Sequence, residues 1–144
     1  MECPMPTINT NDIKEIRKIF DEVHSIAIIG LSPDESKASN MVARYLQQEG
    51  FKIIPVYPKE ETILGEKVYR SLSEIDERVD MVDMFRKSAI ADALLEEVLK
   101  RDDVKVFWLQ LGIVNNEACE KAKVAGLTVV QNKCAKIEHQ RVAV

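Results

Sequence analysis

The chain has few of the residues that build metal sites or disulfide frameworks. It contains two histidines and three cysteines, and Cys3, Cys119 and Cys134 lie far apart with no CxxC pair. Two histidines are too few for a histidine-rich metal site. An odd number of widely spaced cysteines is typical of reduced thiols rather than of disulfides or zinc ligands. We therefore expect a cytoplasmic protein without a metal site.

Long apolar runs and blocks of like charge are also missing. The longest apolar segments are about five or six residues, far below the roughly 18 of a membrane span. No basic stretch followed by an apolar run stands near the start, so we expect no secretory signal. The 20 basic and 24 acidic residues are spread along the chain and give a net charge of −4. That balance argues against binding to nucleic acid or to an anionic membrane.

Short apolar runs alternate with helical spacings over most of the sequence. We expect one domain over residues 1–144, with a flexible lead-in at 1–9 and a tail at 131–144 that has no clear period. The spacing predicts a helix over 38–49, followed by Gly50 as its end signal, and Asn115 is predicted to cap a later helix that ends at Gly126. The predicted strands are 25–29, 52–56, 81–85, 104–109 and 127–130.

Strands that alternate with helices predict a parallel sheet with helices on both faces. Right-handed crossovers make this an α/β, Rossmann-like, doubly wound sheet, most simply with the strand order 3-2-1-4-5 along the chain. In such a sheet, ligands bind beyond the carboxyl ends of the strands, at the switch point beside the first strand. The loop after Ile29 is therefore the expected site.

That loop, residues 30–40, has the composition of a phosphate site. Gly30 lets the backbone turn, and Ser39 and Asn40 stand where the next helix begins, so that free N–H groups and the helix dipole favour a phosphate. Lys37 supplies the local cation. An alternative is that the serines only form turns and caps. The candidate phosphate contacts are Gly30, Leu31, Ser32, Lys37, Ser39 and Asn40.

The segment after the second strand favours a cofactor with a phosphorylated ribose. The phosphate loop matches neither GxGxxG nor a Walker motif. NAD enzymes place a carboxylate at the end of the second strand to hold the ribose hydroxyls, whereas this chain has none there before Glu60. Lys59 would accept a ribose phosphate, which favours coenzyme A and, less well, NADP. The candidate contacts in this segment are Pro55, Val56, Tyr57, Pro58 and Lys59.

Seven segments carry a resemblance to a known family. They are IAIIGLS (26–32), KASNMVARYL (37–46), IIPVYP (53–58), ILGEKVYRSLSEI (63–75), VDMVDMFRK (79–87), VFWLQLGIVNNEA (106–118) and NKCAKIEH (132–139). In this order and spacing, from about residue 12 to the end, the chain resembles the small stand-alone CoA-binding proteins. These are relatives of the CoA-binding domain of succinyl-CoA synthetase and of related acyl-CoA ligases. The chain departs from the family at Tyr57, where Asn is usual, and at Ala38 and Ala135, where Pro is usual.

The resemblance implies that the loop at 30–40 receives the CoA diphosphate and that Tyr57 to Lys59 lie near the adenosine. Phe85 and Arg86 would border the same crevice, although a surface ion pair is an equal alternative for Arg86. Gln110 and Asn115, after the fourth strand, are candidates for contacts with the pantetheine arm. The synthetases use a phosphorylated histidine in a separate domain that is missing here, so no catalytic residue is implied.

The leading hypothesis is a non-catalytic module that binds CoA or acyl-CoA as a carrier, sensor or subunit. The alternatives are an NAD(P)-binding oxidoreductase or the nucleotide-binding subunit of a split acyl-CoA ligase, and either needs a separate catalytic chain. The alternatives for a protein partner are a second copy of the chain, which makes a homo-oligomer, and a ligase-like partner chain. Cys134 would form a mixed disulfide with CoA if Lys133 and Lys136 lower its pKa, but a buried packing role is the simpler reading. Trp108 is expected in the core.

Overall fold

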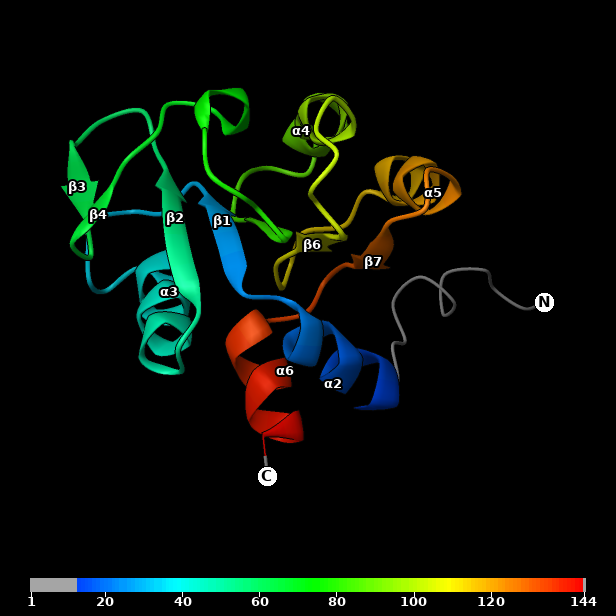
Figure 1. Cartoon of the computed structure of the whole chain (residues 1–144), viewed down its shortest axis with the longest axis horizontal. Coiled ribbons are helices and arrows are strands. Elements are labelled where there is room, and N and C mark those ends of the chain that lie inside the picture. The colour runs from blue at the N-terminus through cyan, green and yellow to red at the C-terminus, as the bar shows by residue number, and fades with distance from the viewer. Residues whose placement is uncertain (1–12, 144) are drawn as a thin grey trace.

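The computed structural model describes residues 13–143 and has a parallel sheet with helices on both faces (Figure 1). The strands of the sheet are β1 (Ser25–Ile29), β2 (Lys52–Val56), β5 (Met81–Met84), β6 (Val106–Leu109) and β7 (Thr128–Val130). Every neighbouring pair is parallel, which confirms the predicted α/β, Rossmann-like class and its five strands. The expected lead-in at 1–9 lies outside the described residues.

The strand order corrects one expectation. The sheet runs β2-β1-β5-β6-β7, which is 2-1-3-4-5 along the chain and not 3-2-1-4-5. Pro55 in β2 gives a physical reason, because proline has no N–H and is confined to the edges of sheets. The Pro55 carbonyl accepts from the N–H of Tyr69 at 2.9 Å. Since both backbone groups of a strand residue point to the same side, the missing donor of Pro55 lies on the outer edge.

The long connection after β2 covers this edge. It contains a hairpin that the sequence did not predict, β3 (Thr62–Ile63) with β4 (Glu66–Lys67), followed by a short 3-10 turn at Leu72–Glu74. Tyr69 forms a parallel bridge with Val56 at the end of β2. Figure 1 shows the hairpin beside β2. The first sheet edge is therefore occupied by the chain's own connection.

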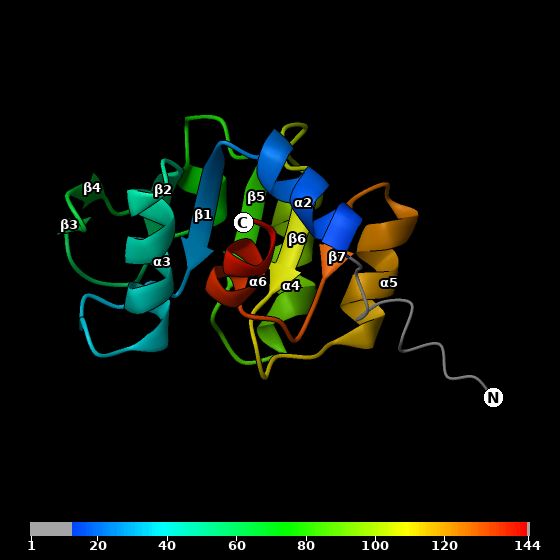
Figure 2. The same ribbon diagram turned by 90° about the horizontal axis from the view of Figure 1, so that it is seen from below.

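Helices divide between the two faces of the sheet. The turn at Leu72–Glu74, α4 (Ile90–Leu99) and α5 (Asn116–Val124) cover one face, and α2 (Ile13–Glu22), α3 (Ala38–Gln48) and α6 (Ala135–Val142) cover the other (Figures 1 and 2). The strands alternate accordingly: in β1, Ala27 and Ile29 pack toward α4 and α5, whereas Ile26 and Ile28 pack toward α2, α3 and α6. Because both faces are covered, each strand is almost wholly apolar.

Helix α6 lies in the tail at 131–144, where no clear apolar period was found. Its buried positions are Ala135, Glu138, His139 and Val142, so half of its inner face is polar. His139 joins it to the rest of the fold: its Nδ1 lies 2.6 Å from the hydroxyl of Tyr45 on α3. The imidazole also meets the rings of Phe20 and Phe51 edge-on, at centroid distances of 5.0 and 5.6 Å. Aromatic contacts thus replace the aliphatic spacing by which helices are usually recognised.

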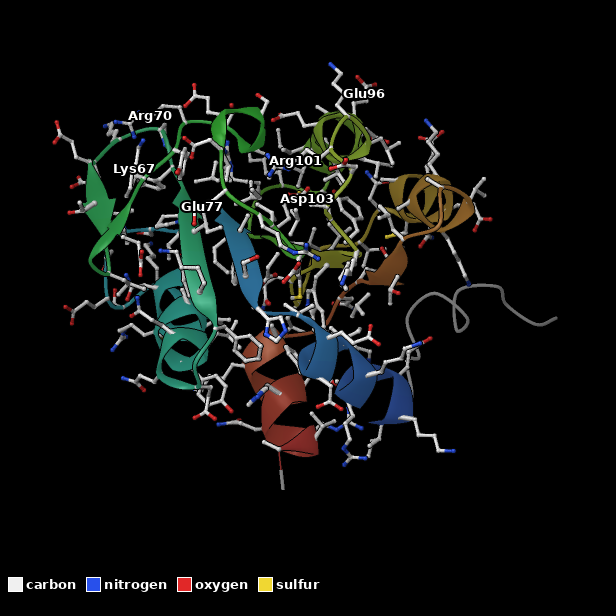
Figure 3. All side chains as sticks on the ribbon, in the orientation of Figure 1. Lys67, Arg70, Glu77, Glu96, Arg101 and Asp103 are labelled. Carbon is white, nitrogen blue, oxygen red and sulfur yellow. The ribbon has the colours of Figure 1, made fainter. Side chains whose placement is uncertain are left out.

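Two carboxylates fix the start of β5. Asp80 accepts from the N–H groups of His24 and Ser25 and from Arg78. Burial raises the pKa of Asp80, but these hydrogen bonds outweigh it and hold the pKa below its usual value. Asp103 is paired with Arg101 in the same region (Figure 3). Both carboxylates therefore favour the folded state in their ionised form.

Asp83, unlike Asp80 and Asp103, is a buried carboxyl group in the core without a hydrogen-bond partner among the described residues. Its side chain is 0% exposed in β5, between Ile28 of β1 and Trp108 of β6. Neither carboxyl oxygen has a hydrogen-bond partner among the described residues. Burial alone raises the pKa of Asp83 well above its usual value, because the charged form would lose its hydration without compensation.

We predict that Asp83→Asn stabilises the chain increasingly as pH rises. Because the folded pKa is raised, the folded state keeps a proton that the unfolded state loses above about pH 4. The wild type therefore loses stability as pH rises from there toward the folded pKa. The advantage of the variant should grow by up to about 1.4 kcal/mol per pH unit in that range. Urea unfolding between pH 4 and pH 9 measures it, and a pH-independent difference would contradict it.

Asp80→Asn is the matched control, since the pKa of Asp80 is lowered rather than raised. This variant should be less stable than the wild type near neutral pH. Its deficit should shrink as pH falls below about 4, where the carboxyl group of the unfolded wild type becomes protonated before that of the folded state.

We also predict that Tyr45→Phe destabilises the chain by about 1 kcal/mol, the net value of one hydrogen bond. The change removes only the hydroxyl that meets His139 and leaves the ring contact between the two side chains. Tyr57→Phe is the control, because the Tyr57 hydroxyl has no hydrogen bond to a described residue. Equal unfolding midpoints in urea for the two variants would refute a role of this bond in holding α6.

Candidate functional site

The loop from Gly30 to Lys37 joins β1 to α3 at the carboxyl edge of the sheet. Gly30 has φ +88°, a conformation that other residues rarely adopt. A Cβ at this position would lie 2.8 Å from Cδ of Arg86, which follows β5. The Gly30 N–H donates to the carbonyl of Val56 at 2.8 Å. Glycine thus lets the end of β1 lie directly under the Arg86 side chain, at the point where the strand order of the sheet reverses.

Side chains of the loop hold it in a closed turn. The N–H of Ser32 donates to Oγ of Ser39 at 3.0 Å, and Nδ2 of Asn40 donates to the carbonyl of Ser32 at 2.8 Å. Ser36 donates from its N–H and its hydroxyl to Asp34, and these bonds lower the pKa of that carboxyl. Ser39 and Asn40 are buried. Their side chains therefore have the turn-forming role that the sequence left open as an alternative, and their contact with a ligand stays a prediction.

The first turn of α3 keeps unused donors. Among the described residues, the N–H groups of Ala38 and Ser39 have no acceptor, and Lys37 at the N-cap makes no capping hydrogen bond. Lys37 is exposed beside them. Free N–H groups, a helix dipole and a lysine together favour an anion at this place.

Arg86 adds a second cation at the same edge. It is exposed and forms no ion pair with any residue that the structure describes. The surface ion pair that the sequence left open for Arg86 is therefore not seen. Phe85, half-buried before it, packs against the core on the α3 and α6 side. Leu31 is fully buried and can offer a ligand only its backbone.

Arg44 braces the loop from α3, a role that the sequence analysis missed. Its Nε donates to Oδ1 of Asn40 at 2.9 Å, and Nη2 donates to the carbonyl of Glu35 at 3.0 Å. The spacing of four residues between Asn40 and Arg44 is a readable signal, since such positions are neighbours on a helix.

Arg70 supports the loop after β2 (Figure 3) and was also missed. Its Nη1 donates to the carbonyl oxygens of Tyr57, Lys59 and Glu60 at 3.1, 2.9 and 2.9 Å. Tyr57 is half-buried, Pro58 and Lys59 are exposed, and Pro55 and Val56 are buried. No local pattern points to Arg70, because its partners are brought to it by the turn of the chain.

A pocket of about 140 Å³ opens between the ends of β1 and β2 and helix α4. Arg70 and Arg86 both line it. Its apolar lining consists of Ile29, Val56, Leu72, Ile90, Ala93 and Leu94. An apolar floor with guanidinium groups at its side suits a flat aromatic base next to phosphate, since arginine stacks on aromatic faces and pairs with phosphate.

The amides after β6 hold neighbouring elements. Oε1 of Gln110, only 4% exposed, accepts from the N–H of Ala135 at the start of α6. Asn115 caps α5 by accepting from Ala118 and also donates to the carbonyl of Ser88. The predicted cap at Asn115 is confirmed. A pantetheine contact for Gln110 or Asn115 stays a prediction.

Two of the remaining side chains, Trp108 and Cys119, lie in the core, and the mixed disulfide of Cys134 with CoA stays a prediction. Trp108 is fully buried, as expected, and its indole donates to the carbonyl of Lys133 at 2.8 Å. Cys119 is buried, and burial raises the pKa of its thiol to about 12. Cys134 is half-buried at the N-cap of α6.

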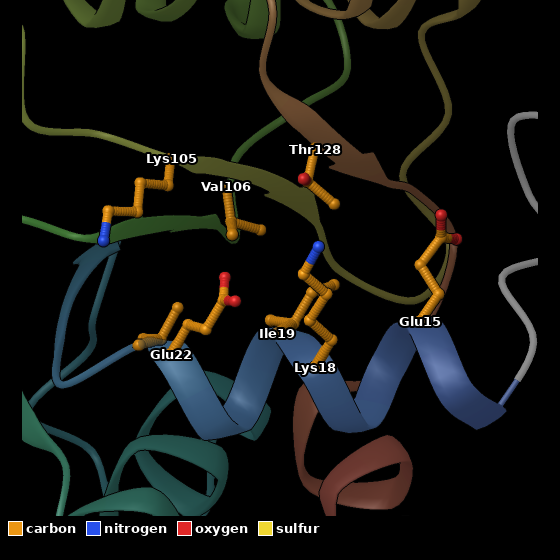
Figure 4. A pocket seen from close by; sticks show the side chains of 8 residues that line it. Glu15, Lys18, Ile19, Glu22, Lys105, Val106 and Thr128 are labelled. Carbon is orange, nitrogen blue, oxygen red and sulfur yellow. The ribbon is translucent and has the colours of Figure 1, made fainter.

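Another pocket, also of about 140 Å³, lies at the amino ends of the strands, between α2 and the starts of β6 and β7 (Figure 4). Its charged lining mixes signs: Glu15, Lys18 and Glu22 on α2 and Lys105 before β6. It is separated from the carboxyl edge by the length of the strands. Among residues 13–143, no helix is long and apolar enough to cross a membrane.

Comparisons with known proteins identify the family of the chain. The family model for the CoA-binding domain matches residues 24–140. The chain is 41% identical to YneT of Bacillus subtilis over 125 residues, 87% of this chain and 92% of that one. A structure from Pyrococcus horikoshii superposes with a TM-score of 0.90 at 36% identity, covering 100% of both chains.

A more distant similarity concerns only part of a larger protein. The alpha subunit of the ADP-forming acetate–CoA ligase II of Pyrococcus furiosus is 34% identical over 79 residues, which are 54% of this chain and 17% of that subunit. The family match, the near-complete relative and the superposed fold lead to one conclusion. The chain belongs to the CoA-binding domain family.

Proposed function

We propose that the chain binds coenzyme A or acyl-CoA across the carboxyl edge of the sheet, as a non-catalytic carrier, sensor or subunit. The free N–H groups of Ala38 and Ser39 and the exposed Arg86, whose side chain packs over Gly30 at the same carboxyl edge, carry this proposal. A diphosphate placed there meets backbone donors and cations from two sides, Lys37 and Arg86.

The other parts of the cofactor follow the order of the strands. The pocket beside Arg70 receives the adenine, and Lys59 lies in the adjacent loop, where a ribose phosphate would be placed. The pantetheine arm then runs over the end of β5 toward Gln110 at the end of β6. Membership of the CoA-binding domain family supports coenzyme A as the ligand.

A second candidate function is the nucleotide-binding subunit of a split acyl-CoA ligase. The similarity to the alpha subunit of the Pyrococcus furiosus acetate–CoA ligase favours it. Such a role also needs CoA at the same edge, together with a catalytic partner chain. An NAD(P)-binding oxidoreductase differs from both in its cofactor.

The melting temperature of the purified chain with CoA, 3′-dephospho-CoA, NAD or NADP separates these cofactors. We expect CoA to stabilise most, by about 2.7 kcal/mol at a hundredfold excess over its dissociation constant, a rise of several degrees. The ribose phosphate of CoA should make it more effective than 3′-dephospho-CoA. Stabilisation by NADP without stabilisation by CoA would refute the proposal.

Arg86→Gln tests the diphosphate position. We expect about a tenfold loss of CoA affinity, because a charge-assisted hydrogen bond contributes about 1.5 kcal/mol or more. Arg17→Gln, an exposed arginine of α2 away from the carboxyl edge, should bind CoA as the wild type does. Titration calorimetry measures both affinities. Equal affinities for the two variants would place the diphosphate elsewhere.

A further inference from the structure

Two large apolar side chains stand exposed just beyond β6. Leu111 is 61% exposed and Val114 is 37% exposed. We call residues 111–114 the apolar lip. Residues 110–116 (QLGIVNN) contain no charge, in a chain of which 31% of the residues are charged. A ligand that covers the lip therefore does not have to desolvate a charged side chain of this segment.

The lip is held in place by the residues around it. The N–H of Gly112 donates to Oδ1 of Asn132 at 2.7 Å, and the N–H of Asn115 donates to Oε1 of Gln131 at 2.8 Å. Ile113, between the two exposed side chains, turns inward and packs against the core under α4 and α5. Leu111 and Val114 are thus presented outward from an anchored turn.

The position of the lip relates it to the cofactor, and this step rests on the proposed function. Adjacent strands are about 4.8 Å apart, so β6 lies three strand spacings, about 14 Å, from β2 along the carboxyl edge. With adenosine at β2 and diphosphate at β1, the pantetheine arm passes β5. Its sulfur then reaches the end of β6, where the lip begins.

We propose that the apolar lip contacts the acyl group of a bound acyl-CoA and favours apolar acyl chains over short or charged ones. Leu111 and Val114 supply the apolar surface, and they follow β6 at the same carboxyl edge as the loop after β1. An acyl chain lying on the lip is covered on one side, so each methylene loses part of its contact with water and makes binding tighter.

Titration calorimetry with CoA, acetyl-CoA, hexanoyl-CoA, butyryl-CoA and succinyl-CoA tests this. For the wild type we expect hexanoyl-CoA to bind about tenfold more tightly than acetyl-CoA. Butyryl-CoA should bind more tightly than succinyl-CoA, which has the same number of acyl carbons but ends in a carboxylate. In Leu111→Ser the difference between hexanoyl-CoA and acetyl-CoA should fall to about twofold or less, while the affinity for CoA itself stays unchanged.

Val124→Ser is the matched control, because Val124 is 79% exposed on α5 at the opposite edge of the sheet. It should keep both the CoA affinity and the tenfold preference. Wild-type chain that binds CoA with no preference among acyl groups would overturn the lip assignment and leave the proposed function intact. Failure to bind CoA at all would overturn both. A dimer that dissociates in Leu111→Ser without any acyl preference would assign the lip to a second copy of the chain instead.

Discussion

The parallel pairing of β1 with β5 determines where this chain can hold a ligand. β5, the next strand of this sheet after β2 along the chain, lies on the opposite side of β1 from β2. The connection from β1 to β2 and the connection from β5 to β6 therefore cross different faces of the sheet. Helix α3 crosses one face and α4 the other, so a crevice opens above the end of β1. Gly30 brings the backbone close beneath Arg86 at this point, and the start of α3 turns free N–H groups toward the same edge. The loop at residues 30–40, the position of Arg86 and the pocket beside Arg70 all depend on this reversal of the strand order at β1.

Most strands and several helix ends could be predicted because local sequence patterns indicate them. The five strands are short apolar runs, and Gly50 and the cap at Asn115 mark helix boundaries that the structure confirms. The strand order was wrong although a signal existed: Pro55 lacks an N–H and favours an edge strand. The simplest order placed β2 in the interior, where that missing donor would have interrupted a ladder.

The parts that escaped prediction depend on contacts between distant residues. Helix α6 is held by His139 against Tyr45, 94 residues away, so its inner face carries no aliphatic period. Arg70 reaches the loop after β2 only because the hairpin folds the chain back. For the loop at residues 30–40, the sequence left two roles open for the side chains, turn formation and phosphate contact, and the structure shows the first. Ser39 and Asn40 close the turn, and the backbone amides beside them are left for a ligand.

The two edge strands of the sheet, β2 and β7, differ in the backbone groups that another chain could pair with. At the β2 margin, the bridge to Tyr69 and the missing N–H of Pro55 leave no continuous ladder of backbone groups for an incoming strand. At the β7 margin only Thr128–Val130 is extended, which is too short to template a long foreign strand. Edge-to-edge polymerisation is thereby discouraged on both sides, which favours helical faces and loops over a continued sheet for any association of this fold.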